Sequence, residues 1–260
     1  MQPSPFNYQQ AFARVQAQPL SPSDTAAFLR KVYSFFTLSV LAAAAGALVS
    51  LYAGTGTSQL TLTLSNGSTV VVPPLIGFFA RHWIIGGLLF LGSVFGASFV
   101  RHRPGLNVAA LTGMGFVSGL VVAPAIWITQ MMALTGTTLT QSPVRDAFLL
   151  ASAGFIGLTA YALVSRKDFS FMRGFLSMGL WVVLGAILLN IFIGSSAFAL
   201  AIASAGVLLF GGYILFDTSR LLRRPEERGD AVGAAISIYL SFLNLFLFLL
   251  TIFRGGSRDG

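Results

Sequence analysis

The chain has 260 residues, of which 55% are hydrophobic and only 9% are charged, and its mean hydropathy is +0.80. A soluble domain carries roughly 25% charged residues, so most of this surface cannot face water. The formal net charge of +8 falls in short clusters between apolar runs, which indicates membrane topology rather than nucleic-acid binding. The absence of cysteine excludes disulfides, thiolate metal sites and a cysteine nucleophile. We therefore expect an integral membrane protein whose principal surroundings are the lipid bilayer.

The first 30 residues are polar and rich in Pro, Gln and Ser, a composition that predicts a disordered leader. The first apolar run predicts a span over residues 31–53. The polar segment that follows, residues 54–74, contains LTLTLSNGSTVVV, which alternates by twos around Asn66 and Gly67. Such alternation on either side of Asn-Gly predicts a short β-hairpin on the outer surface.

The rest of the chain is a series of apolar runs, each long enough to cross a bilayer as a helix of about 20 residues. They predict further spans over about 75–100, 106–134, 144–164, 169–193, 197–222 and 231–253, followed by a short tail over 254–260. Arg81 and His82 place the first turns of the second span at the membrane interface. The expected fold class is an all-α polytopic membrane protein with seven transmembrane helices.

The positive charges indicate the orientation, because Lys and Arg accumulate in cytoplasmic segments. With the N-terminus inside, twelve of the 16 basic residues fall on the cytoplasmic side and four on the outer side, the four being Arg81, Arg145, Arg254 and Arg258. The odd number of spans then puts the C-terminus outside. A re-entrant hairpin formed by the last two runs would instead leave the tail inside.

Asp217 is the one acidic residue that lies within an apolar run, in GGYILFDTSRLL. An intramembrane carboxylate costs about 2.5 kcal/mol or more at the bilayer centre, so it is a functional candidate by default. Arg220 lies three residues later, at a helix-neighbour spacing, and a structural ion pair between the two would explain Asp217 equally well. Both interpretations stay open from the sequence.

Other chemistry is sparse. The two histidines, His82 and His102, fall at opposite ends of one predicted span, and no motif for a catalytic site, cofactor or metal centre is present. Asp217 alone is a weak metal candidate, because calcium takes six to eight oxygen ligands. We therefore expect neither an enzyme nor a bound cofactor.

The third predicted span carries two packing signals. Gly115 and Gly119 form a small-xxx-small step, which is typical of close helix packing in membranes. Pro124 removes a backbone hydrogen bond within the same span, so a kink is expected there, with a gate hinge as the alternative.

Several segments together resemble the Bax inhibitor-1 family of membrane proteins. They are RKVYSFF at 30–36, VSGLVVAPAI at 117–126, LTAYALVSRKDFSFM at 158–172, GGYILFDTSRLL at 211–222 and SIYLSFLNLFLFLL at 237–250. The SRKDFSF and LFDTSRLL pieces are the specific ones. The last motif and the SRKDFSF stretch are most similar to the bacterial branch that modulates the FtsH protease.

The resemblance implies six helices around the last one, and it implies a site. In calcium-leak members two aspartates in the sixth and seventh spans share a proton-sensitive hydrogen bond, and an arginine near the end of the second span latches to the first. Asp217 matches the first aspartate, Arg101 matches the latch, and Ser241 stands at the second aspartate's position. An Asp–Ser pair keeps the hydrogen bond but loses the coupled titration of two carboxylates.

Two functions follow from the resemblance. The first is a regulatory protein of the bacterial inner membrane that engages an FtsH-type protease complex, with the N-terminal leader as the segment that the protease grips. The second is a pH-sensitive leak for calcium or another cation, or for protons, gated near Asp217 and Arg101. A small-solute transporter rests only on Pro124 and the glycines.

Overall fold

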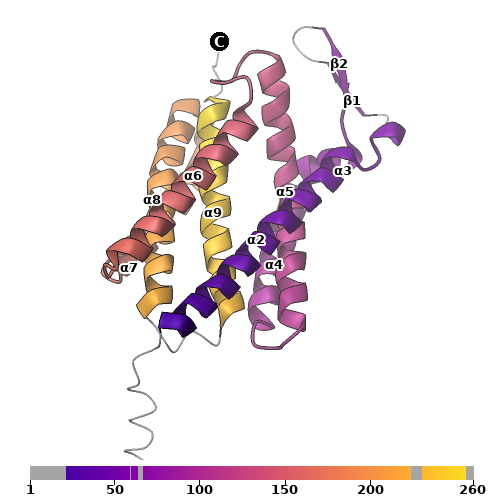
Figure 1. The fold of residues 1–260 in the computed structure, drawn as a ribbon. Helices are drawn as coiled ribbons and strands as arrows, with labels where there is room; N and C mark the ends of the chain where they lie inside the picture. Colours follow the sequence, from indigo (N-terminus) through magenta and orange to yellow (C-terminus); the bar gives the residue numbers. More distant parts are fainter. Residues whose placement is uncertain (1–21, 59, 64–66, 224–229, 256–260) are drawn as a thin grey trace, which may run out of the picture.

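The computed structural model describes residues 22–58, 60–63, 67–223 and 230–255, and these residues form a bundle of helices with a small hairpin at one end (Figure 1). In chain order the elements are α2 (Pro22–Tyr52), η1 (Thr55–Thr57), β1 (Thr61–Thr63), β2 (Thr69–Val71), α3 (Pro74–Arg81), α4 (Trp83–Phe99), α5 (Leu106–Leu134), α6 (Pro143–Ser165), α7 (Met172–Ile193), α8 (Ser196–Arg223) and α9 (Ala231–Arg254).

Six of these helices, α2 and α5 to α9, are each long and apolar enough to cross a membrane. The bent pair α3 and α4 makes a seventh span if it is counted as one. Five of the predicted spans, from the third to the seventh, agree with α5 to α9 to within a few residues. The chain is therefore a multi-pass, all-α membrane protein, as the hydropathy predicts.

The prediction of one second span over 75–100 is wrong in its geometry. The chain bends by 94° between α3 and α4, because the His82 backbone leaves the helical region at φ −112° and ψ 50°. Arg81 ends α3 at this bend, and a charged residue is costly in the interior of an apolar span. Ile76 and Phe79 are the buried residues of α3, and this short helix packs against α5 and α2.

The predicted start of the first span is also too late. The helix begins at Pro22 rather than residue 31, so the expectation of a disordered leader is wrong for residues 22–30. Proline is favoured in the first turn of a helix, and Asp24 suits the positive N-terminal end of the helix dipole. Phe28 is buried in the main hydrophobic core. Residues 1–21 of the predicted leader and residues 256–260 of the predicted tail lie outside the described residues.

The predicted hairpin is confirmed. β1 and β2 pair antiparallel in the register Thr61 with Val71, Leu62 with Val70 and Thr63 with Thr69. Figure 1 shows the two strands projecting from the end of the bundle where α3 lies.

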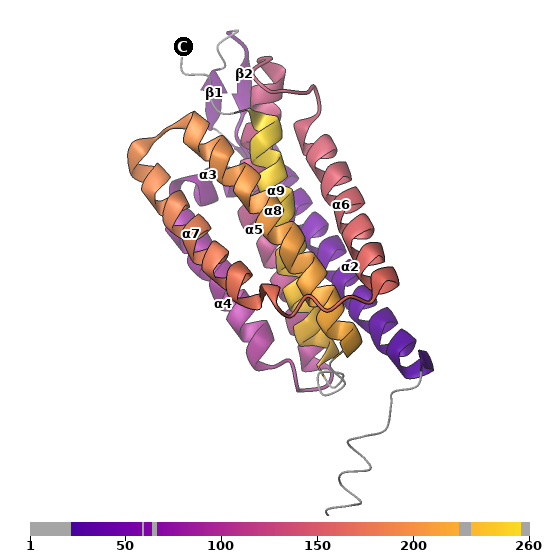
Figure 2. The same cartoon turned by 90° about the vertical axis from the view of Figure 1, so that its left-hand side faces the viewer.

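The last helix, α9, is the most buried of the six long helices. It packs against α8, α6, α2, α5 and α4, whereas α7 packs mainly against α8 and lies at the edge of the bundle (Figure 2). The start of α2 and the end of α9 lie at opposite ends of the bundle (Figure 1), as an odd number of crossings requires. Large apolar side chains such as Phe192 and Phe99 point outward, which suits a surface in contact with lipid.

Candidate functional site

Asp217 lies at the interface between α8 and α9 and is only 5% exposed. Its Oδ2 atom accepts hydrogen bonds from the hydroxyl groups of Ser237 at 3.0 Å and Ser241 at 3.2 Å. Ser237 and Ser241 are four residues apart on α9, so they lie on the same face of that helix. The fold therefore places the Asp217 carboxylate in the interior of the bundle, where two hydroxyl groups donate to it.

The position of Asp217 along α8 is close to one end of the span. Arg223, the last residue of the helix, lies six positions later, which is less than two helical turns. Ser241 is in contact with Asp217, as the resemblance implies. Ser237 is a second hydroxyl donor to the same carboxylate. The alternative ion pair between Asp217 and Arg220 stays a prediction.

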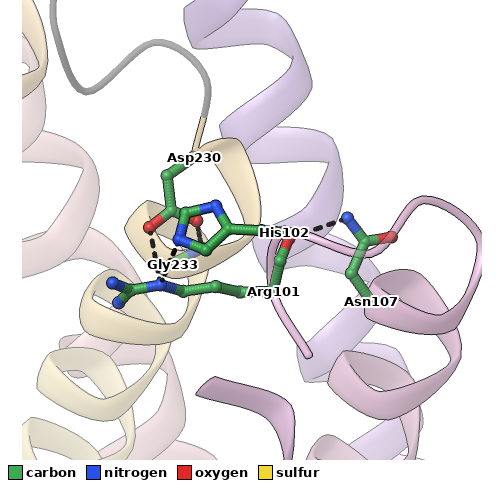
Figure 3. Close-up of polar contacts among 5 residues, drawn as sticks. All are labelled: Arg101, His102, Asn107, Asp230 and Gly233. Atoms are coloured by element: carbon green, nitrogen blue, oxygen red, sulfur yellow. Dashed lines mark hydrogen bonds and ion pairs between the residues drawn. The ribbon is translucent and has the colours of Figure 1, made fainter. Parts of the chain in front are cut away.

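The expected latch between Arg101 and Asp217 is not formed. Arg101 instead pairs with Asp230, with 3.2 Å between its Nε atom and Oδ2 of the acid (Figure 3). Asp230 is the N-cap of α9, and its Oδ1 accepts a hydrogen bond from the Gly233 backbone N–H at 2.7 Å. The physical reason is access: Asp230 is partly exposed at the end of α9, next to the α4–α5 loop, whereas the Asp217 carboxylate is buried between two helices.

The α4–α5 loop has further polar contacts around Arg101. The Nε atom of Arg101 also donates to Nε2 of the neighbouring His102 at 3.1 Å, and the backbone carbonyl of Arg101 accepts from the Asn107 side chain at 3.0 Å. Figure 3 shows these groups gathered between the loop and the first turn of α9. The cluster therefore ties the α4–α5 loop to the beginning of the helix that carries both serines.

A second group of buried hydroxyls lies near Asp217. The Tyr33 hydroxyl of α2 lies near those of Thr159 on α6 and Thr218 on α8, and near the Asp217 carboxylate. All three hydroxyl oxygens are buried, and those of Thr159 and Thr218 lie close enough to the Tyr33 hydroxyl to interact with it. Buried polar groups are normally hydrogen-bonded, so the meeting of hydroxyl groups from three helices makes a polar region beside Asp217 in the interior of the bundle.

The site supplies one carboxylate and several hydroxyl groups. Within the described residues, no three or more His, Cys, Asp or Glu side chains form a group that could hold a metal ion. The arrangement can attract a cation or bind a proton, because a buried carboxylate is sensitive to any nearby positive charge. It lacks the several carboxylates of a rigid calcium cage.

Sequence reasoning missed three parts of this region. Ser237 could have been found from its i−4 spacing to Ser241, which puts the two hydroxyls on one helix face. The sequence gives no signal that Asp230 pairs with Arg101, because the contact joins a loop to a helix 129 positions later in the chain. Thr218 is adjacent to Asp217 and gave no separate signal.

Gly115 and Gly119 lie where α5 crosses α2. A Cβ atom added at Gly115 would be 2.5 Å from the backbone oxygen of Ser39, and one at Gly119 would be 1.9 Å from that of Ala43. The two backbones therefore touch, as small residues permit. Pro124 is buried within α5, which continues as one helix from Leu106 to Leu134.

The fold and the buried carboxylate define the class of protein as a polytopic helical membrane protein with a polar site inside its bundle. The family described as "Inhibitor of apoptosis-promoting Bax1" matches residues 25–259 of the chain. The chain therefore belongs to this family, the Bax inhibitor-1 family, as its motifs suggest.

Relatives of the chain occur in bacteria, mammals and viruses. It is 37% identical to Protein lifeguard 4 of Mus musculus over 226 residues, which cover 86% of this chain and 83% of the relative. It is 32% identical to an uncharacterized protein of Campylobacter jejuni over 235 residues, with 89% and 90% coverage. It is also 32% identical over 234 residues to the Golgi anti-apoptotic protein of Vaccinia virus strain Lister, with 89% and 86% coverage.

Proposed function

We propose that this chain provides a regulated leak pathway for cations, in which Asp217 is the ion-attracting group. The observation that supports this proposal is the burial of the Asp217 carboxylate between α8 and α9, with two serine hydroxyls bound to one of its oxygens. A carboxylate in a membrane interior is costly to maintain. A passing cation offsets that cost and explains why an acid is present at this place.

The serine contacts give the pathway its closed state. Ser237 and Ser241 hold the carboxylate against α9, so a cation can use Asp217 fully only when these contacts loosen. The Arg101–Asp230 pair fastens the α4–α5 loop to the N-terminus of α9 and thereby resists movement of that helix. Loosening of α9 from α8 is thus the opening step, and protonation of Asp217 removes the charge that attracts the ion.

The test is calcium uptake into proteoliposomes that contain equal amounts of inserted protein. Asp217→Asn keeps the shape of the side chain and removes its charge, so uptake should fall by about tenfold or more. Tenfold corresponds to about 1.4 kcal/mol, which is less than one charge contact at 4 Å in a partly polar interior. Asp146→Asn is the matched control, because Asp146 lies in the first turn of α6, paired with the neighbouring Arg145, and its uptake should equal that of the wild type.

A third variant, Ser241→Asp, separates this protein from two-carboxylate relatives. It places a second carboxylate beside Asp217, so uptake should rise and become more dependent on pH, because two close carboxylates cannot both ionise cheaply. Uptake equal to that of empty liposomes in the wild type, in Asp217→Asn and in Ser241→Asp would contradict the leak proposal. Uptake in Ser241→Asp alone would show that Ser241 has removed the leak from this chain.

A second function, modulation of an FtsH-type protease in the bacterial inner membrane, is supported by a different observation. The loops at one end of the bundle, between α4 and α5 and between α6 and α7, carry four basic residues: Arg101, Arg103, Arg166 and Lys167. By the positive-inside rule this end is cytoplasmic, with the N-terminus on the same side and the C-terminus in the periplasm. It offers a surface to an acidic partner, and α2 begins at the same end of the bundle.

The protease proposal is tested by deletion of residues 1–21, which leaves α2 intact from Pro22. Turnover of the protein in cells should slow when this segment is removed, and the protease should co-purify with the full chain from native membranes. Unchanged turnover together with no recovered protease would contradict this function. Neither result bears on calcium uptake by the purified protein.

A further inference from the structure

An apolar groove of about 870 Å³ lies on the side of the bundle where α2, α5, α6 and α9 meet. Binding sites for small molecules usually have volumes of roughly 300–1,000 Å³. Ala44, Ile126, Tyr239, Phe242 and Phe246 are among its lining residues. The groove is therefore large enough for a ligand and is lined mainly by hydrocarbon and aromatic surface.

The groove opens sideways, toward the bilayer. Leu41 and Phe148 line it from α2 and α6, and their side chains are 63% and 44% exposed. These helices approach each other nearer the beginning of α2, where Phe36 stacks on Phe155 at a ring-centroid distance of 4.6 Å. The aromatic contact lies beyond the lining residues, toward the start of α2, and the exposed Leu41 and Phe148 leave the side of the groove accessible to lipid chains.

The other end of the groove is polar and carries a positive charge. Gln130 lies near the end of α5, and Gln141 and Arg145 lie on either side of the start of α6. The Nε atom of Arg145 forms an ion pair with the Asp146 carboxylate at 3.0 Å, and the Arg145 side chain is 69% exposed. Arg145 is therefore placed at the end of the bundle with donors available for an anion.

We propose that this groove binds one membrane phospholipid, with an acyl chain along α9 and the phosphate group on the NH2 groups of Arg145. The charge pattern matches this ligand: an apolar channel within the hydrocarbon region ends at an exposed cation near the helix termini, where headgroups lie. Guanidinium and phosphate form paired, charge-assisted hydrogen bonds. The amides of Gln130 and Gln141 supply further donors at the same end.

The groove and the Asp217 site lie on opposite faces of α9. At 100° per residue, Ser237 and Ser241 project to one side of the helix, while Phe242 and Phe246 project to the other. Lipid binding is therefore independent of the carboxylate chemistry and can be tested apart from any ion movement.

Native mass spectrometry of detergent-purified protein titrated with phosphatidylglycerol tests the proposal. Ala44→Phe fills the groove and should abolish retention of the one tightly held lipid. Ala45→Phe is the matched control, because Ala45 is an exposed neighbour on α2 that does not line the groove, and it should retain the lipid. Equal retention by the two variants would overturn the proposal.

The headgroup contact has its own test. Arg145→Gln should weaken phosphatidylglycerol binding by about ten- to a hundredfold, the range for loss of hydrogen bonds to a charged group. Diacylglycerol, which lacks the phosphate, should bind the wild type and Arg145→Gln equally. Equal phosphatidylglycerol affinity in the wild type and the variant would refute the placement of the phosphate.

A cysteine-labelling experiment tests occupation of the groove without the bulky phenylalanine of Ala44→Phe. Because the chain has no cysteine, single variants Ala44→Cys and Ala45→Cys can be labelled with a maleimide in detergent. Added phosphatidylglycerol should slow labelling at position 44 and leave position 45 unchanged. Equal protection at the two positions, or protection at neither, would contradict occupation of the groove.

Discussion

The contact between α2 and α5 makes a sharp prediction for Gly119. A Cβ atom there would be 1.9 Å from the backbone oxygen of Ala43, whereas real Cβ atoms essentially never come within 3.0 Å. In Gly119→Ala the two helices must therefore move apart by at least 1.1 Å, because the obstructing atom is backbone and cannot rotate away. Overpacking in a core costs about 1–3 kcal/mol, and the most extensive helix pairing in the bundle is the one disturbed.

Gly113→Ala is the matched control on the same helix, because a Cβ atom at Gly113 meets nothing within 4 Å. Alanine improves helix propensity over glycine by about 1 kcal/mol in both variants, so that term cancels in the comparison. The free energy of unfolding, measured by SDS titration in mixed micelles, should be about 1–3 kcal/mol lower for Gly119→Ala than for Gly113→Ala. Equal stability of the two variants would refute the close approach of the helices.

Three further predictions concern polar contacts of α9, all read from unfolding free energies in the same micelles. Ser241→Ala should cost about 0.6 to 1.7 kcal/mol, the range for interhelical hydrogen bonds in membranes; a neutral result would contradict its contact with Asp217. Asp230→Ala should cost about 1–2 kcal/mol because it loses both the cap and the ion pair, whereas Asp230→Asn keeps the cap and should cost less than about 1 kcal/mol; equal losses would contradict the capping role. Tyr239→Phe should cost about 0.5–1.5 kcal/mol, because it removes the hydrogen bond between the Tyr239 hydroxyl and the buried Ser118 hydroxyl on α5, which still donates to the Gly115 carbonyl; full stability would contradict that contact.

Much of the fold follows from hydropathy, because the long apolar helices need no information beyond their length and composition. The bend at His82 does not follow from hydropathy, because the average over residues 75–100 is apolar and shows no break. It depends on α3 burying Ile76 and Phe79 against the rest of the bundle. The early start of α2 was hidden by polar composition, although Asp24 and the buried Phe28 account for it once the tertiary contacts are known.

Part of the candidate site could also be predicted from hydropathy. Asp217 stands out as an acid in an apolar run, and the family motif adds Ser241. The partner of Arg101 was not predictable, because several acids are near in sequence to the end of α8 and only the packed structure places Asp230 beside the α4–α5 loop. Local sequence also gave no indication that the Tyr33 and Thr159 hydroxyls come together from α2 and α6.

The most direct test of the proposed leak is calcium uptake by the double variant Ser237→Ala and Ser241→Ala in proteoliposomes. The two serines hold the Asp217 carboxylate at 3.0 and 3.2 Å, and we propose that this contact keeps the pathway closed. Removal of both hydroxyl groups should therefore raise the rate of uptake above that of the wild type, and the further change Asp217→Asn should abolish the increase. A rate unchanged from the wild type, at equal protein insertion, would contradict the proposal that these contacts form the gate.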